Sequence, residues 1–271
     1  MGAGIYTKLD IRWGYNNIQV KEGDERKAAF KTSEGLFEPT VMFFSLTNSP
    51  ATFQTMMDNI FRQWIMAGWI KKTFHKLKTI KTGLKVYMDD MLIYTEVEKP
   101  GQPSEEELEA HREAVSDILR SLEANDLYLK PEKCLFNRPE VEYLGVIVGN
   151  SVIKMDPVKV EGIAKWETPK TVKDVHSFLG FCNFYRAFIK DFSRKAQPLN
   201  YLTKKNVKFE WNDKAQKAFE ALKDTCSSYP VLRMPDWKKQ FILEMDASGY
   251  ALGAVISQHF EDGIHPIAFH S

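Results

Sequence analysis

Apolar positions along the first sixty residues predict a strand, a hairpin and a helix. The apolar run over 5–20 predicts a strand that ends near Asp10 and breaks at Gly14. Residues 28–30 and 35–41 predict two short strands joined by a tight turn.

Two helices are predicted from their start signals. Pro50 after Ser49 opens the first, because proline is favoured in the first helical turn. Six large apolar side chains follow at helical spacing and are interpreted as core: Phe53, Met56, Met57, Ile60, Phe61 and Trp64. Ser104 with Glu107 forms a capping-box pattern before a second helix over 105–125.

Residues 85–94 are two apolar runs joined by Asp89 and Asp90, which predicts a β-hairpin with carboxylates at its tip. The stretch 71–83 before it is basic. A surface loop is the favoured interpretation of that stretch, and nucleic-acid binding is the less favoured one.

Beyond residue 140 the pattern becomes strands, then helices, then strands again. Strands are predicted over 141–148 and 152–155, helices from Pro157 and over 171–181, 184–192 and 215–227, a linker over 230–236, and strands over 241–258 and 267–269. This order indicates an α+β protein.

Composition adds limits rather than a function. The 271 residues are 44% hydrophobic and carry a net charge of +1, which neither supports nor excludes a nucleic-acid partner, because a local basic groove suffices to bind phosphates. Three widely spaced cysteines argue against structural zinc and favour a reducing, intracellular compartment, cytoplasmic or nuclear. No apolar run is long enough for a bilayer, so neither a membrane location nor secretion is expected.

The adjacent carboxylates of Asp89 and Asp90 repel each other, and a divalent cation would turn that cost into a binding site. Asp10 could add a third carboxylate from a neighbouring strand. Two magnesium ions held in this way support in-line phosphoryl transfer. Taken alone, however, two aspartates between strands are more often a polar turn.

The surrounding motifs change that balance. Tyr87-Met88-Asp89-Asp90 is similar to the catalytic YxDD box of reverse transcriptases, and 8–16 resembles their first catalytic motif. Residues 36–39 with 46–54 resemble the second motif, and 142–145 the turn that grips the primer end. Residues 177–186 resemble Ty3/gypsy long-terminal-repeat retrotransposons, with fungal members closest.

The resemblance implies an α+β fold with a reverse-transcriptase palm, fingers and thumb. A palm with partial fingers is expected over 1–150, a helical thumb or connection over 151–230, and the truncated start of a ribonuclease H-like domain over 231–271. The family's polyproteins also carry protease, ribonuclease H and integrase parts, which are expected partners of this chain.

The resemblance also implies a reaction: deoxynucleoside triphosphates extend a primer paired with an RNA or DNA template. Asp10 and Asp89 would hold two Mg²⁺ ions, or Mn²⁺, with support from Asp90 and the backbone carbonyl of Ile11. Tyr15 would exclude a ribose 2′-hydroxyl, with a core aromatic as the alternative.

Other roles follow from position in the motifs. Phe44 and Ser45 would contact the nucleotide, and relatives usually have glycine in place of Ser45. Lys133 would protonate the leaving pyrophosphate, with a plain surface lysine as an equal alternative. Gln54 would contact the template, and Tyr143, Leu144 and Gly145 the primer.

Asp246 resembles the first metal ligand of ribonuclease H, but the further carboxylates that such a site needs do not follow it, so no nuclease activity is expected. Three departures motivate a second hypothesis, a degenerate remnant that retains at most nucleic-acid binding. The motif of Asp10 comes early, the basic stretch 71–83 interrupts the family pattern, and serine stands at position 45.

Overall fold

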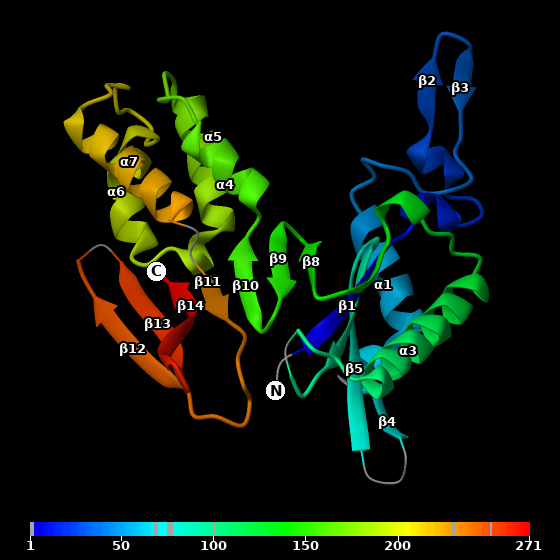
Figure 1. The fold of residues 1–271 in the computed structure, drawn as a ribbon. Helices are drawn as coiled ribbons and strands as arrows, with labels where there is room; N and C mark the ends of the chain where they lie inside the picture. Colours follow the sequence, from blue (N-terminus) through cyan, green and yellow to red (C-terminus); the bar gives the residue numbers. More distant parts are fainter. Residues whose placement is uncertain (1–2, 68–69, 75–77, 100, 229–230, 250) are drawn as a thin grey trace. The chain divides into compact units, whose positions relative to one another are not determined.

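The structure is a computed structural model that describes residues 3–67, 70–74, 78–99, 101–228, 231–249 and 251–271. The chain forms two compact units, Met1–Leu144 and Gly145–Ser271, and each is described by itself (Figure 1). The three-part division expected from sequence stays a prediction.

A five-stranded antiparallel sheet forms the centre of the first unit, in the order β4-β5-β6-β1-β7. Its strands are β1 (Ala3–Asp10), β4 (Ile70–Phe74), β5 (Lys78–Tyr87), β6 (Asp90–Glu96) and β7 (Leu135–Arg138). Strands β5 and β6 form the expected hairpin, with Asp89 and Asp90 at its tip.

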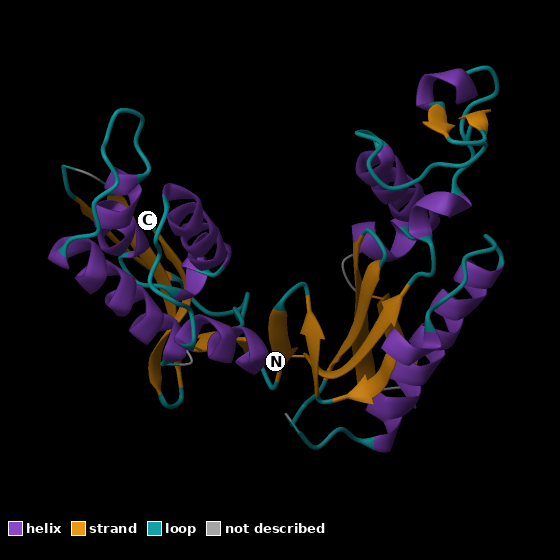
Figure 2. Ribbon diagram, turned by 90° about the horizontal axis from the view of Figure 1, so that it is seen from above, coloured by secondary structure: helices purple, strands orange, loops and turns teal. Residues whose placement is uncertain are grey.

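Helices pack on one face of this sheet and share a single core with it. They are α1 (Ser49–Ile60), α2 (Arg62–Ala67) and α3 (Glu105–Glu123), and α3 lies along the strands (Figure 2). Leu9 and Ile11 point from the sheet into the core and meet Phe53 and Met57 of α1 and Ile118 of α3. The capping box of Ser104 and Glu107 is confirmed.

The expected short hairpin is also confirmed, as β2 (Phe30–Thr32) and β3 (Gly35–Phe37), and it projects away from the five-stranded sheet (Figure 1). Short 3₁₀ turns at Gly14–Asn17, Glu25–Ala28 and Pro131–Lys133 and strand β8 (Glu140–Tyr143) complete the first unit.

The loop expected over 71–83 was wrong. Strand β4 pairs with the first half of β5, from Ile70 opposite Thr82 to Phe74 opposite Lys78, so the stretch extends the sheet as a hairpin. Its turn, 75–77, lies outside the described residues. Backbone pairing with the sheet outweighed the polar, lysine-rich composition that favoured a loop.

The second unit combines helices with two small groups of strands. Its helices are α4 (Pro157–Ala164), α5 (Val172–Phe184), α6 (Phe192–Leu202) and α7 (Asp213–Ser227). Strands β9 (Val146–Gly149), β10 (Val152–Met155) and β11 (Val231–Arg233) pair in sequence, as do β12 (Ile242–Ala247), β13 (Leu252–Phe260) and β14 (Gly263–His270).

Three expectations beyond residue 140 were wrong in detail. The expected strand over 141–148 is broken at Leu144 and Gly145, whose φ angles are 49° and 78°. The expected linker contains β11, because buried Leu232 joins the core and pairs with Ile153. The expected helix over 184–192 is only a 3₁₀ turn, Arg186–Phe188, because Asp191 takes a left-handed φ of 57° and α6 begins after it.

No helix in the described part of the chain is long and apolar enough to cross a bilayer.

Candidate active site

Strand register brings Asp10 and Asp90 together. The two residues stand directly opposite each other at the end of the β1–β6 ladder. Alternation along β1 sends Leu9 and Ile11 into the core, so Lys8 and Asp10 share the other face. Asp10 is nevertheless only 7% exposed. The sheet therefore gathers carboxylates where it would otherwise expose polar side chains to water.

Asp89 lies in the two-residue turn between Tyr87 and Asp90. Its backbone carbonyl accepts a hydrogen bond of 2.9 Å from the N–H of Ile11, which ties the hairpin tip to the end of β1. The other turn residue, Met88, has a φ of 52°. Its N–H donates to the Gln54 side chain at 2.7 Å.

Three lysines form ion pairs with Asp10 and Asp90. Lys130 Nζ lies 2.7 Å from Asp10 Oδ1, and Lys133 Nζ lies 3.6 Å from Asp10 Oδ2. Lys8 Nζ lies 3.5 Å from Asp90 Oδ1 and donates to Glu142 at 2.8 Å. The backbone N–H of Lys130 also donates to the Asp10 carbonyl at 2.9 Å, which fixes this segment beside β1.

The titration behaviour reflects this crowding. Partial burial raises the pKa of Asp90, and the charges of Asp89 and Asp10 raise it further, against the opposing effect of Lys8. Burial disfavours the Lys8 ammonium, but Glu142 and Asp90 outweigh burial and the pKa of Lys8 is raised. The hydrogen bond to Asp10 is the main cause of a raised pKa at Lys130. A site with surplus negative charge is one that favours a cation.

Tyr15 stands beside this tip in an aromatic cluster. Its ring meets Phe44 edge-on at 5.3 Å and Phe53 at 5.8 Å between centroids, and its hydroxyl lies 3.6 Å from Met88 Sδ. Phe44 is 71% exposed and Ser45 has a φ of 79°, a conformation that favours glycine.

The segment expected to contact the primer ends the first unit. Tyr143 is buried, and burial raises its pKa. Leu144 is partly exposed and, like Gly145, has a positive φ, so the chain turns sharply here. Glycine is favoured at position 145, because a Cβ added there would lie 3.1 Å from the Phe184 ring.

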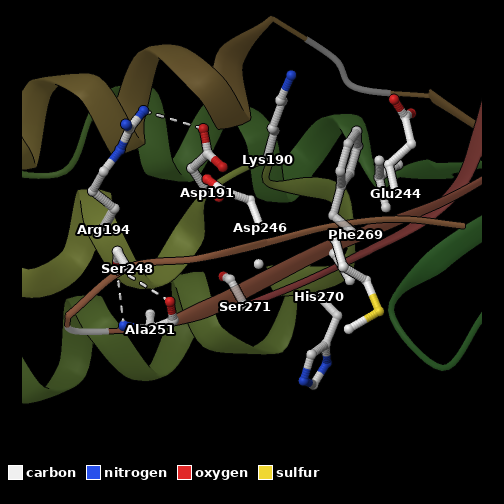
Figure 3. A pocket seen from close by; sticks show the side chains of 14 residues that line it. Lys190, Asp191, Arg194, Glu244, Asp246, Ser248, Ala251, Phe269, His270 and Ser271 are labelled. Carbon is white, nitrogen blue, oxygen red and sulfur yellow. Dashed lines mark hydrogen bonds and ion pairs between the residues drawn. The ribbon is translucent and has the colours of Figure 1, made fainter.

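Asp246 belongs to a different place in the protein. It lies on β12 of the second unit and lines a pocket of about 450 Å³ with Lys190 and Asp191, which precede α6, and with Arg194 in the first turn of α6 (Figure 3). Arg194 and Asp191 form an ion pair of 3.2 Å. Asp246 thus belongs to the second unit, whereas Asp10, Asp89 and Asp90 belong to the first.

The oxygen donors at the hairpin tip are of the chemical type that binds magnesium. Asp10, Asp89 and Asp90 offer hard carboxylate oxygens, the ligands that Mg²⁺ prefers. Among the described residues, no three His, Cys, Asp or Glu side chains already enclose an ion position. Magnesium at polymerase-type sites takes one or two carboxylates and completes its shell with substrate phosphates and water, so an open donor set fits it.

Sequence reasoning missed three contributors: Lys8, Lys130 and Glu142. Lys8 contacts Asp90 on the adjacent strand, Lys130 lies 120 residues from its partner Asp10, and Glu142 lies 134 residues from its partner Lys8. The alternation of Lys8 with Asp10 on one strand face was the available signal. The bonds of Gln54 to the hairpin were missed as well.

Comparison with known proteins shows the family of the chain. Residues 2–148 match the family model described as "Reverse transcriptase (RNA-dependent DNA polymerase)". The chain belongs to the reverse transcriptase family. Residues 211–271 match a second model, "RNase H-like domain found in reverse transcriptase".

Curated relatives of the chain are retrotransposon polyproteins. The Transposon Tf2-3 and Tf2-4 polyproteins of Schizosaccharomyces pombe are each 34% identical over all 271 residues. The chain spans 18% of the length of each. The expected resemblance to fungal Ty3/gypsy-type polyproteins is confirmed.

Solved structures confirm the fold. A foamy viral protease-reverse transcriptase in complex with RNA/DNA hybrid matches 98% of this chain and 33% of its own, with a TM-score of 0.75 and 19% identity. The same viral protein in a complex with double-stranded DNA matches 98% of this chain and 42% of its own, with a TM-score of 0.76. The α+β reverse-transcriptase fold expected from sequence is therefore present.

Proposed function

We propose that this chain carries the RNA-directed DNA polymerase activity of its family and adds deoxynucleotides to a primer 3′-hydroxyl. The observation that carries the proposal is the register of β1 and β6, which sets Asp10 opposite Asp90, with Asp89 next to it at the hairpin tip. Carboxylates placed in this way can hold the divalent ions that assist phosphoryl transfer, whereas those of an ordinary turn only face water.

Reverse transcriptases work with divalent metals, and Asp10 and Asp89 would hold two such ions here, with Asp90 in support. When bound, divalent ions activate the attacking hydroxyl and stabilise the leaving oxygen of the displacement. The protein's own part is positioning and charge: the Ile11 N–H fixes Asp89, and the lysines around Asp10 and Asp90 balance charge. The Ile11 carbonyl is proposed as a further ligand.

The nucleotide would lie against the aromatic cluster. Tyr15 is held by Phe44, Phe53 and Met88, so its ring is fixed well enough to exclude a 2′-hydroxyl. Exposed Phe44 and neighbouring Ser45 would contact the nucleotide. Lys133, next to Asp10 and with its side chain half-exposed, is proposed as the acid that protonates pyrophosphate.

The nucleic-acid partner is proposed to be a template paired with its primer. The matched foamy viral structures contain an RNA/DNA hybrid and double-stranded DNA. The turn at Tyr143, Leu144 and Gly145 would contact the primer. The remaining parts of a polyprotein would be the protein partners, since the relatives are polyproteins.

Primer extension tests the proposal. The purified chain should extend a DNA primer on an RNA template with Mg²⁺, and Asp89→Asn should lower the rate on the order of 1,000-fold, because a charge that stabilises the transition state is lost. No extension by the wild-type chain, or equal extension by Asp89→Asn, would overturn it.

The second candidate, an inactive remnant that binds nucleic acid, has one observation in its favour. Ser45 occupies a left-handed conformation that favours glycine, so the backbone is strained at the expected nucleotide contact. Salt-sensitive binding of primer–template without any synthesis would support this alternative.

A further inference from the structure

We infer that Gln54 is a positioning residue that holds the hairpin tip in the conformation that presents Asp89 and Asp90. The catalytic part of this inference rests on the proposed polymerase function. The conformational part does not, because it concerns only the bonds between α1 and the β5–β6 hairpin.

The Gln54 side chain bridges two backbone groups of the hairpin. Its Oε1 accepts the N–H of Met88 at 2.7 Å, and its Nε2 donates to the Val86 carbonyl at 3.4 Å. The two groups lie on either side of Tyr87. Gln54 therefore takes the place of a neighbouring strand for the last residues of β5.

The backbone conformation of Met88 requires stabilisation by surrounding bonds. It is the first of the two central residues of the β5–β6 turn, and its φ is 52°. Two-residue hairpin turns favour glycine where φ is positive, since a Cβ makes the left-handed conformation unfavourable. A methionine stays in this conformation when surrounding bonds fix it, and the Gln54 bond is made by its own N–H.

Asp58, one helical turn after Gln54, sets the direction of the carboxamide. Its Oδ1 accepts from Gln54 Nε2 at 2.8 Å. A carboxylate can only accept, so the amide nitrogen must face Asp58 and the amide oxygen must face the Met88 N–H. Both hydrogens of Nε2 then have partners, Asp58 and Val86. A template contact through this nitrogen would require breaking one of those bonds.

The tip is fixed from its other side by the bond from Ile11 N–H to the Asp89 carbonyl. Loss of the Gln54 bonds should leave that anchor in place. We therefore expect a loosened tip in a folded protein, with misplaced carboxylates rather than a collapsed sheet.

A double-mutant cycle tests the brace without any need for activity. Gln54→Met keeps the length of the side chain and removes both hairpin bonds. Met88→Gly removes the Cβ that makes the turn unfavourable. The loss of urea midpoint caused by Q54M should be at least halved in the M88G background, because glycine adopts the turn unaided. Equal losses in both backgrounds would overturn the inference.

Steady-state kinetics then separate positioning from template binding. Q54M should lower kcat on the order of 100-fold and change the Kd for primer–template, measured by fluorescence anisotropy, by less than about twofold. Gln63→Met, the same change at an exposed position of α2, is the matched control and should change neither. A raised Kd with kcat restored at saturating template would mean that Gln54 contacts the template and would overturn its positioning role.

The two failures can be told apart. A wild-type chain that extends no primer contradicts the proposed function, and the double-mutant cycle still decides whether Gln54 braces the turn. A chain that extends primers but shows no coupling between Gln54 and Met88 contradicts the brace alone.

Discussion

The two units differ in what they bury. Among the described residues, the first unit buries Thr7, Asp10, Ser49, Thr82, Thr95, Glu107 and His111, whereas the second buries only Ser257 and Gln258 among polar side chains. The core of the second unit is aromatic and aliphatic, built around Phe178, Tyr185 and Phe219. Buried polar groups must be hydrogen-bonded to be tolerated, so the first unit is the more demanding one to build.

The same contrast separates two aspartates on strands. Asp10 is buried, paired with lysines and opposite a second carboxylate. Asp246 is exposed on β12. An acidic residue at a strand is thus a weak sign of chemistry by itself, and the enclosure around it carries the information.

Lowering the pH should destabilise the first unit before the second. His111 bridges Thr7 and Thr95 at 2.8 Å each, and burial lowers its pKa from 6.5 to about 4. The unfolded chain binds a proton near pH 6.5 and the folded chain only near 4, so stability is lost as pH falls through this window, by about 3 kcal/mol.

Urea unfolding between pH 7 and 4, with hydrogen exchange to locate the loss, measures this effect. His111→Phe should flatten the pH dependence, although it lowers stability at pH 7 because Thr7 and Thr95 lose a partner. A wild-type profile that is flat between pH 6.5 and 4 would contradict the assignment.

A substitution of Tyr15 tests whether this residue of the first unit acts in the site or only packs in the core. As a gate, Tyr15→Val should raise ribonucleotide incorporation relative to deoxynucleotide incorporation on the order of 100-fold, because the ring no longer blocks the 2′-hydroxyl. The ratio of kcat/KM values for the two nucleotides is the measurement. Lower stability with an unchanged ratio would show that Tyr15 only packs against Phe44 and Phe53.

Ser45 tests whether the first unit carries local strain. Ser45→Gly should stabilise the protein by about 1 kcal/mol, because glycine has no Cβ penalty at a φ of 79°. Ser33→Gly, in an exposed turn without a positive φ, is the matched control and should not stabilise. Equal shifts in melting temperature for both variants would argue against strain at Ser45.

Lys130 should have the smallest effect. Lys130→Met removes the cation at 2.7 Å from Asp10 and leaves Lys133 at 3.6 Å. Competition between lysine and metal for Asp10 would then fall, and Mn²⁺ affinity should rise about threefold, as expected for a partly exposed ion pair. Weaker Mn²⁺ binding, measured by calorimetry, would show that Lys130 supports the metal site instead.

Local rules predicted the local features well. The capping box before α3, the proline-led start of α1 and the hairpin carrying Asp89 and Asp90 follow from residues within a few positions of each other. Expectations were wrong where distant backbone decided the outcome: β4 joined β5, and β11 joined β10 through Leu232.

The candidate site divides in the same way. The motifs identified the three aspartates, but the bonds that hold them could not be predicted, since the Gln54–Met88 contact spans 34 residues and the Asp10–Lys130 contact spans 120. Side-chain direction and strand register decide such contacts, and neither can be predicted from a short sequence motif.

The most direct test of the central claim is calorimetric Mn²⁺ titration in the presence of primer–template and a non-hydrolysable deoxynucleotide analogue. We predict binding to the wild-type chain, its loss in Asp10→Asn and Asp89→Asn, and wild-type binding in Asp246→Asn. Binding that survives both first-unit substitutions, or that is lost only with Asp246→Asn, would contradict a metal centre at the tip of the β5–β6 hairpin beside Asp10.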